Sequence, residues 1–126
     1  MNKRILTIIV SILIMTISIF GLSKSVIAKE VAYLSASSAN TWLAASVKEM
    51  DAVASANGIN ITEFDAQFDP AKQTAQLQDA IASGKYDGIV LCAIYGVGLI
   101  PDIEAAIAAG IEIVVLNQVV GADLTT

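Results

Sequence analysis

The sequence contains no histidine and a single cysteine, Cys92. Without histidine, the chain lacks the usual base of a nucleophilic triad and the commonest nitrogen ligand of zinc. One cysteine cannot form a disulfide within the chain, and its place in the apolar run Ile89–Ala93 indicates a small buried residue rather than a reactive thiol. We therefore expect a protein that is not an enzyme and that holds neither a metal nor another cofactor.

Basic residues are also scarce, with seven Lys and Arg against twelve Asp and Glu. Three of the seven lie in the first 28 residues, so residues 29–126 keep four basic residues against all twelve acidic ones, a net charge of −8. A domain this acidic repels the phosphates of nucleic acids and of anionic lipids. Nucleic acid is therefore excluded from the expected partners.

The first 28 residues follow a different pattern from the rest. Lys3 and Arg4 precede the 16-residue apolar run Ile5–Phe20, and the small residue Ala28 closes the segment. This is the three-part pattern of a secretory signal peptide, and the run is shorter than the ~20 residues that span a bilayer. We predict that residues 1–28 are removed and that the remaining chain is periplasmic or secreted, without membrane insertion. A retained membrane anchor is the alternative.

Three glycines, Gly58, Gly84 and Gly110, lie 26 residues apart. Each one follows a stretch of helical periodicity and precedes a short strand-like segment. Glycine often ends a helix because it adopts the left-handed conformation without the steric cost of a β-carbon. The repeat predicts an α/β fold, with a parallel sheet of about four strands and helices on both faces.

The expected strands are 31–34, 59–64, 88–92 and 113–116, and the expected helices are 42–57, 101–109 and one that starts at Asp69-Pro70. The alternating pattern of 59–64 indicates a half-exposed strand near a sheet edge. Among helix positions, we expect Thr74, Leu77, Ile81, Ile103 and Ile107 to face inward, and Gln73 and Gln76 to face solvent. The segment 117–126 has no clear element. An apolar last strand with no following partner indicates the beginning of a longer protein.

In an open parallel sheet, ligands bind beyond the carboxyl ends of the strands. The residues expected there are rich in hydroxyls and amides, include two aromatics, and contain one carboxylate. An amide donates and accepts hydrogen bonds as a hydroxyl does, and an aromatic ring covers the apolar face of a sugar. We therefore expect a neutral polyhydroxylated or amide-bearing ligand. The candidate ligand-binding residues are Ser35, Asn40, Thr41, Trp42, Tyr95, Asn117 and Gln118.

Simpler roles stay open for several of these residues. Asn40 can cap a helix, Trp42 and Tyr95 can pack against loops, and the nearby Asp65 and Asp69 are expected as loop and cap residues. The hydroxyl-rich segment 35–41 could hold a phosphate at a helix N-terminus. A flavodoxin-like flavin- or phosphate-binding carrier is therefore one alternative function. The sensor domain of a signalling receptor is another.

The stretches Val31–Ser35, Asn40–Trp42, Asp65–Gln73 and Asp87–Leu91, behind an export signal, resemble the periplasmic sugar-binding proteins of the ribose-binding type. These proteins share their fold with the ligand domains of LacI-like repressors. The resemblance covers roughly residues 30–121 and implies a type I periplasmic binding fold. It also implies a two-lobed receptor that delivers a small molecule to a membrane ABC permease, with residues 29–126 as an incomplete N-terminal lobe.

In that family, the loop after the first strand supplies an asparagine and aromatics to the sugar, which the resemblance carries over to Asn40 and Trp42. The end of the fourth strand commonly carries Asp-Arg, whereas this chain has Asn117 and Gln118. The difference removes charge-assisted hydrogen bonds but leaves groups that bind hydroxyls. The resemblance therefore implies a sugar or similar polar solute, bound weakly or not at all by this chain alone, because a second lobe is missing.

Overall fold

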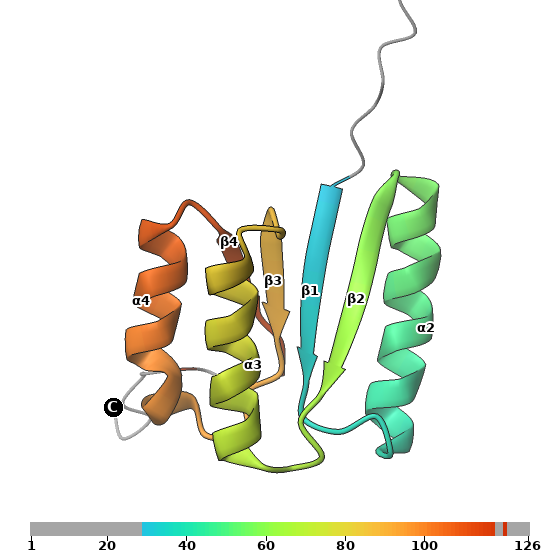
Figure 1. The fold of residues 1–126 in the computed structure, drawn as a ribbon. Coiled ribbons are helices and arrows are strands. Elements are labelled where there is room, and N and C mark those ends of the chain that lie inside the picture. Colours follow the sequence, from blue (N-terminus) through green and yellow to red (C-terminus); the bar gives the residue numbers. More distant parts are fainter. Residues whose placement is uncertain (1–28, 118–119, 121–126) are drawn as a thin grey trace, which may run out of the picture.

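The computed structural model describes residues 29–117 and residue 120 (Figure 1). The predicted signal peptide, residues 1–28, and Gln118 lie outside the described residues. The elements follow in the order β1 (Lys29–Ser35), α2 (Thr41–Ala56), β2 (Ile59–Asp65), α3 (Pro70–Ser83), β3 (Gly88–Leu91), the short 3₁₀ helix η1 (Gly96–Leu99), α4 (Ile100–Ala108) and β4 (Glu112–Val115). Among these elements, no helix is long and apolar enough to cross a membrane.

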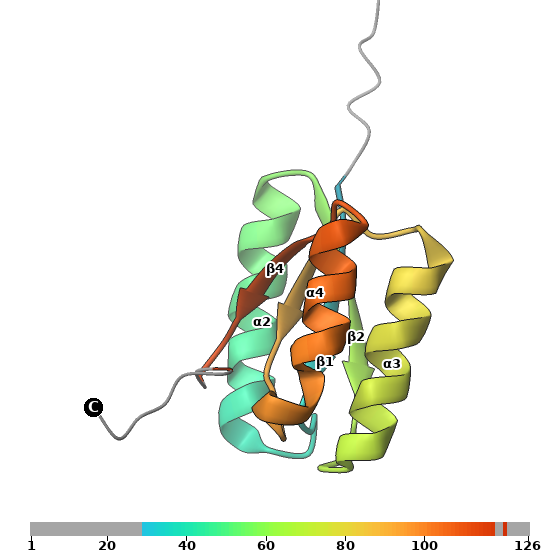
Figure 2. The ribbon, with the colours of Figure 1, turned by 90° about the vertical axis from the view of Figure 1, so that its left-hand side faces the viewer.

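The four strands form one parallel sheet in the order β2-β1-β3-β4. The predicted fold class is therefore confirmed, as is the place of β2 at an edge. Figures 1 and 2 show α2 on one face of this sheet and α3 and α4 on the other. The chain first winds outward from β1 to β2 and then crosses back past β1 to reach β3. The direction of winding reverses at β1 and β3, which makes their carboxyl ends the switch point of the sheet.

Local sequence signals explain where the helices begin and end. Asn40 Oδ1 accepts hydrogen bonds from the Trp42 and Leu43 amides, and Asp69 Oδ1 caps α3 in the same way ahead of Pro70. The three repeat glycines all lie in the left-handed region, with φ of 67°, 60° and 80°. These caps and glycines determine where each helix begins and ends, and so where the next strand can start.

The two faces of the sheet carry cores of different size. The larger core lies beneath α3 and α4 and is built from apolar side chains of β1, β3 and both helices, Leu34, Leu77, Ile89, Leu91 and Ala106 among them. The smaller core lies beneath α2 around Tyr33, Leu43 and Cys92. One helix covers only part of that face, so Val114 of β4 stays 60% exposed.

Two expectations were wrong in detail. Ile107 is 61% exposed, because α4 turns the preceding residue, Ala106, towards the sheet. The last strand runs over Glu112–Val115, one residue earlier than predicted, and its alternate residues are exposed. In the described part of the chain β4 pairs only with β3, which explains why this strand is half exposed.

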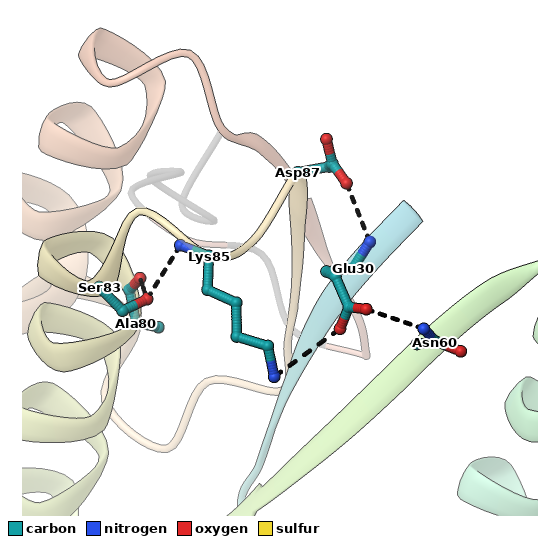
Figure 3. Close-up of polar contacts among 6 residues, drawn as sticks. All are labelled: Glu30, Asn60, Ala80, Ser83, Lys85 and Asp87. Carbon is teal, nitrogen blue, oxygen red and sulfur yellow. Dashed lines mark hydrogen bonds and ion pairs between the residues drawn. The ribbon is translucent and has the colours of Figure 1, made fainter. Parts of the chain in front are cut away.

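A polar network ties the strands together at their amino ends (Figure 3). The Glu30 carboxylate accepts a hydrogen bond from Asn60 Nδ2 at 2.8 Å and pairs with Lys85 Nζ at 3.8 Å. The Glu30 amide donates to Asp87 Oδ2 at 2.9 Å, and this bond and nearby Lys29 lower the pKa of Asp87. The network joins β1 to β2 and to the residues just before β3, at the end of the sheet opposite the carboxyl ends of the strands.

Candidate functional site

The loops at the carboxyl ends of the strands enclose an open hollow of about 380 Å³. Its size falls within the range of small-molecule pockets, and it lies beside the switch point between β1 and β3. The lining residues come from all four strand ends: Ala36, Asn40, Trp42, Leu43, Phe68, Cys92, Ala93, Ile94 and Asn117. None of these lining side chains carries a charge. We call this feature the switch-point hollow.

Three of the seven predicted site residues meet in the switch-point hollow. Asn40 and Trp42 approach from the start of α2, and Asn117 approaches from the end of β4. Asn40 also caps α2 through Oδ1, so it combines the two roles that the sequence left open. Trp42 is 53% exposed, which leaves its ring accessible to a ligand. The chain thus brings two amides and an indole together from distant positions.

The other predicted residues lie elsewhere. Ser35 is fully buried at the end of β1, and Thr41 is exposed without lining the hollow. Tyr95 is 60% exposed and lies over the backbone of Gly98, where a β-carbon would come within 2.6 Å of its ring. Tyr95 therefore packs against its own loop. Gln118 lies outside the described residues, and its predicted role stays a prediction.

Phe68 is an aromatic lining residue that the prediction from the sequence did not include. It is 58% exposed between the end of β2 and the cap of α3. An exposed aromatic in a loop directly after a strand end was the available signal. Phe68 gives the hollow a second aromatic lining residue in addition to Trp42. Two aromatic surfaces suit a ligand that has both hydroxyls and apolar C–H faces.

Three non-glycine residues in the loops at this end have left-handed backbones: Gln67, Phe68 and Asn117, with φ of 55°, 59° and 71°. Left-handed conformations cost β-carbon residues free energy and persist where the surroundings impose them. Here the Phe68 amide donates a 2.7 Å hydrogen bond to the Ala36 carbonyl, which holds the second loop against the first. Backbone strain of this kind gathers at binding sites, and two of the three residues line the hollow.

Asp65 ties the same two loops together with its carboxylate. It accepts hydrogen bonds from the Ser38 amide at 3.2 Å, the Ser38 hydroxyl at 2.7 Å and the Gln67 amide at 2.8 Å. The Ser38 hydroxyl is the main cause of the lowered pKa of Asp65, followed by the Gln67 amide. Since Asp65 and Asn40 already occupy donors of the 35–41 loop and the α2 N-terminus, a phosphate would have to displace them. This arrangement disfavours the flavin or phosphate carrier.

Two buried hydroxyls lie behind the switch-point hollow. Tyr33 and Ser35 are fully buried, and neither side-chain oxygen has a hydrogen-bond partner among the described residues. Burial raises the pKa of Tyr33. The nearby Ser35 hydroxyl acts in the opposite direction and lowers this pKa, although the two hydroxyls do not reach hydrogen-bonding geometry. Cys92 is buried in the smaller core, which confirms it as a small core residue, and this burial raises the pKa of its thiol.

Gln73 was expected to face solvent, and that expectation was wrong. Its side chain is fully buried, its Nε2 donates to the Cys92 carbonyl at 2.9 Å, and its Oε1 accepts from the Ile94 amide at 2.9 Å. Gln76 is also partly buried, and its Nε2 donates to the Asp65 carbonyl at 3.1 Å. A polar side chain on a helix predicts exposure to solvent. Here, however, backbone amides and carbonyls at strand ends that have no neighbouring strand need polar partners from side chains.

A second hollow, of about 540 Å³, opens at the amino ends of the strands. Its lining includes the charged residues Lys29, Asp87 and Glu112. Lys29 and Asp87 already pair with each other at 3.3 Å. No group of three or more metal-ligating side chains occurs in the part of the chain that the structure describes. The switch-point hollow is therefore the better candidate for a neutral ligand.

Residues 31–124 match the sequence profile of the periplasmic binding protein domain. The chain belongs to this family. This is a family of binding proteins rather than of enzymes, in agreement with the expectation from the sequence. The family resemblance stated from the sequence is confirmed as well. The comparison with curated protein sequences found no match.

Solved structures share the fold of this periplasmic binding protein domain. An ABC transporter solute-binding protein from Mycobacterium smegmatis with bound glycerol is 28% identical, with a TM-score of 0.68 over 75% of this chain and 33% of its own. A periplasmic ribose ABC transporter protein from Conexibacter woesei is 22% identical, with a TM-score of 0.71 over 78% and 33%. A Caulobacter myo-inositol binding protein bound to myo-inositol is 19% identical, with a TM-score of 0.69 over 83% and 35%. The chain spans about a third of the length of these proteins.

Proposed function

We propose that this chain belongs to the solute-binding component of an ABC importer and that it binds a neutral polyol or sugar in the switch-point hollow. The observation that carries the proposal is the composition of that hollow. Asn40 and Asn117 offer amides, Trp42 and Phe68 offer aromatic surfaces, and no lining side chain is charged. Amides match hydroxyl groups, whereas an anionic or cationic ligand would lack a counter-charge here.

The structural neighbours support the same class of ligand. They include proteins with bound glycerol and bound myo-inositol and a ribose ABC transporter protein, and all three compounds are neutral and rich in hydroxyls. We further propose that residues 1–28 direct export to the periplasm or the cell exterior, that residues 29–126 form part of the N-terminal lobe, and that a membrane ABC permease receives the solute.

A single lobe covers only one side of a ligand, so we expect weak binding by the chain itself. Dissociation constants on the order of 1 mM or higher correspond to about 4 kcal/mol of binding free energy or less. Trp42 is the only tryptophan in the sequence, so its fluorescence reports on the hollow without interference.

The experiment is a fluorescence titration of the full chain with D-ribose, myo-inositol, glycerol and ribose 5-phosphate. We expect a saturable change in Trp42 emission with at least one neutral compound and a weaker response to the phosphate. Asn117→Gly removes the amide while tolerating the left-handed backbone, and it should weaken binding about tenfold. Asn60→Ala, at the opposite end of the sheet, serves as the control. Preference for the phosphate, or equal effects of the two variants, would contradict the proposal.

A further inference from the structure

Gln73 replaces a missing strand at the end of β3. The last β1–β3 backbone bond runs from the Cys92 amide to the Leu34 carbonyl at 3.0 Å, after which β1 turns away into its loop. The Cys92 carbonyl and the Ile94 amide thus lose their strand partner. The Gln73 side-chain amide bonds to both groups. Its Nε2 donates to the Cys92 carbonyl, and its Oε1 accepts from the Ile94 amide, each at 2.9 Å. A neighbouring parallel strand would offer the same pair of bonds to residues two apart.

The segment that Gln73 holds, residues 92–94, is one wall of the switch-point hollow. Gln73 itself is not among the lining residues. It is fully buried at the start of α3. Its amide bonds to the backbone of this wall, to the Cys92 carbonyl and the Ile94 amide, without entering the hollow itself.

We propose that Gln73 is a positioning residue for the switch-point hollow, whose buried amide sets the place of residues 92–94 and thereby the affinity for ligand. The affinity part of this inference rests on the proposed function. Only a side chain of this length that both donates and accepts satisfies the two backbone groups. A carboxylate at the same place would accept from the Ile94 amide but could only repel the Cys92 carbonyl.

Gln73→Glu tests the positioning role, because protonation of the new side chain should restore what the substitution removes. Protonated glutamic acid donates one hydrogen bond and accepts another, so it restores both contacts. Burial opposite a carbonyl raises the folded-state pKa of this glutamate above its usual value of about 4.3. The stabilisation that the protonated side chain gives the folded state is then fully present below about pH 4.3, and it is lost as pH rises through the folded-state pKa. Gln78→Glu makes the same change on the exposed side of the same helix, where it removes a 3.1 Å hydrogen bond to Asp102 but neither bond to residues 92–94, and it is the control.

The readout is hydrogen exchange at the Ile94 amide of the full chain, compared with wild type at the same pH. We expect Gln73→Glu to exchange there about tenfold faster at pH 7 and at a wild-type rate near pH 4, while Gln78→Glu matches wild type at both. Gln73→Asn, which keeps the amide but is one methylene shorter, should lose protection at both pH values. It also serves if Gln73→Glu does not fold at pH 7.

The ligand part is measured separately, by Trp42 fluorescence with myo-inositol. We expect about tenfold weaker binding by Gln73→Asn than by wild type. If wild type binds no polyol, the proposed function fails while the exchange experiment still decides whether Gln73 holds the wall. Unchanged Ile94 exchange in both Gln73 variants, or an equal loss of protection throughout the sheet, would overturn the positioning role.

Discussion

Replacing Asp65 tests the connection between the two loops that shape the switch-point hollow. Its carboxylate holds Ser38 through two hydrogen bonds and the Gln67 amide through a third, with distances of 2.7 to 3.2 Å. The group is partly accessible to water, and solvent screening reduces each of the three bonds to about 0.7 kcal/mol, below the usual range for charged acceptors. Asp65→Ala should lower the free energy of unfolding by about 2 kcal/mol, and Asp65→Asn by ~1 kcal/mol because one acceptor oxygen remains.

The assay is urea denaturation of the full chain at several pH values, supported by thermal melts. A loss of about 2 kcal/mol in a domain of this size lowers the melting midpoint by ~10 °C. The folded-state pKa of Asp65 lies below its ordinary value of 3.8, so its contribution is present above that value and is lost as pH falls through the lower one. The difference between wild type and Asp65→Ala should therefore shrink at pH 3.

Glu63→Gln is the matched control, because Glu63 is an exposed carboxylate two residues earlier on the same strand. It should change the free energy of unfolding by no more than ~0.5 kcal/mol. An Asp65→Ala effect no larger than this control would refute the account of the loop connection. A difference from wild type that persists unchanged at pH 3 would refute the part assigned to the carboxylate.

Four further outcomes follow from single side chains. Trp42→Ala should weaken polyol binding by ~1–3 kcal/mol in an NMR titration, because the ring lines the hollow; unchanged affinity would remove it from the site. Tyr33→Phe should leave the free energy of unfolding unchanged or raise it by up to ~1 kcal/mol, since its buried hydroxyl has no described partner; a loss above ~1 kcal/mol would reveal one. Gly84→Ala should lower the free energy of unfolding by ~1 kcal/mol in urea denaturation. The cause is the φ of 60° alone, because nothing lies within 4 Å of the added carbon, and an unchanged free energy would contradict this. Cys92 should react with a thiol reagent only as fast as the native state opens, and immediate labelling would show that it is not buried.

The fold could be read from the sequence because several signals agreed. The glycine spacing, the caps Asn40 and Asp69, and the alternation of residues 59–64 all indicated the same βα succession, and the structure has left-handed glycines, both caps and β2 at an edge. Signals of this kind depend on residues that are close in the sequence, so they can be recognised without knowledge of the tertiary fold.

The errors came from contacts between distant residues. Polarity placed Gln73 in solvent, but two backbone groups 19 and 21 residues away draw it into the interior. Phe68 was overlooked because the left-handed backbone that presents it depends on the Ala36 carbonyl in another loop. Strand ends predict where a site lies, whereas loop contacts decide which side chains enter it.

The central claim is that a neutral polyol binds at the carboxyl ends of β1 and β3. Backbone and side-chain amide NMR shifts of the full chain, titrated with myo-inositol, test it most directly. We expect shifts confined to the switch-point hollow, at the side-chain amides of Asn40 and Asn117, the Trp42 indole and the Ile94 amide. Shifts at Gly84 and Gly110 around the amino-end hollow, or none at concentrations well above 1 mM, would contradict it.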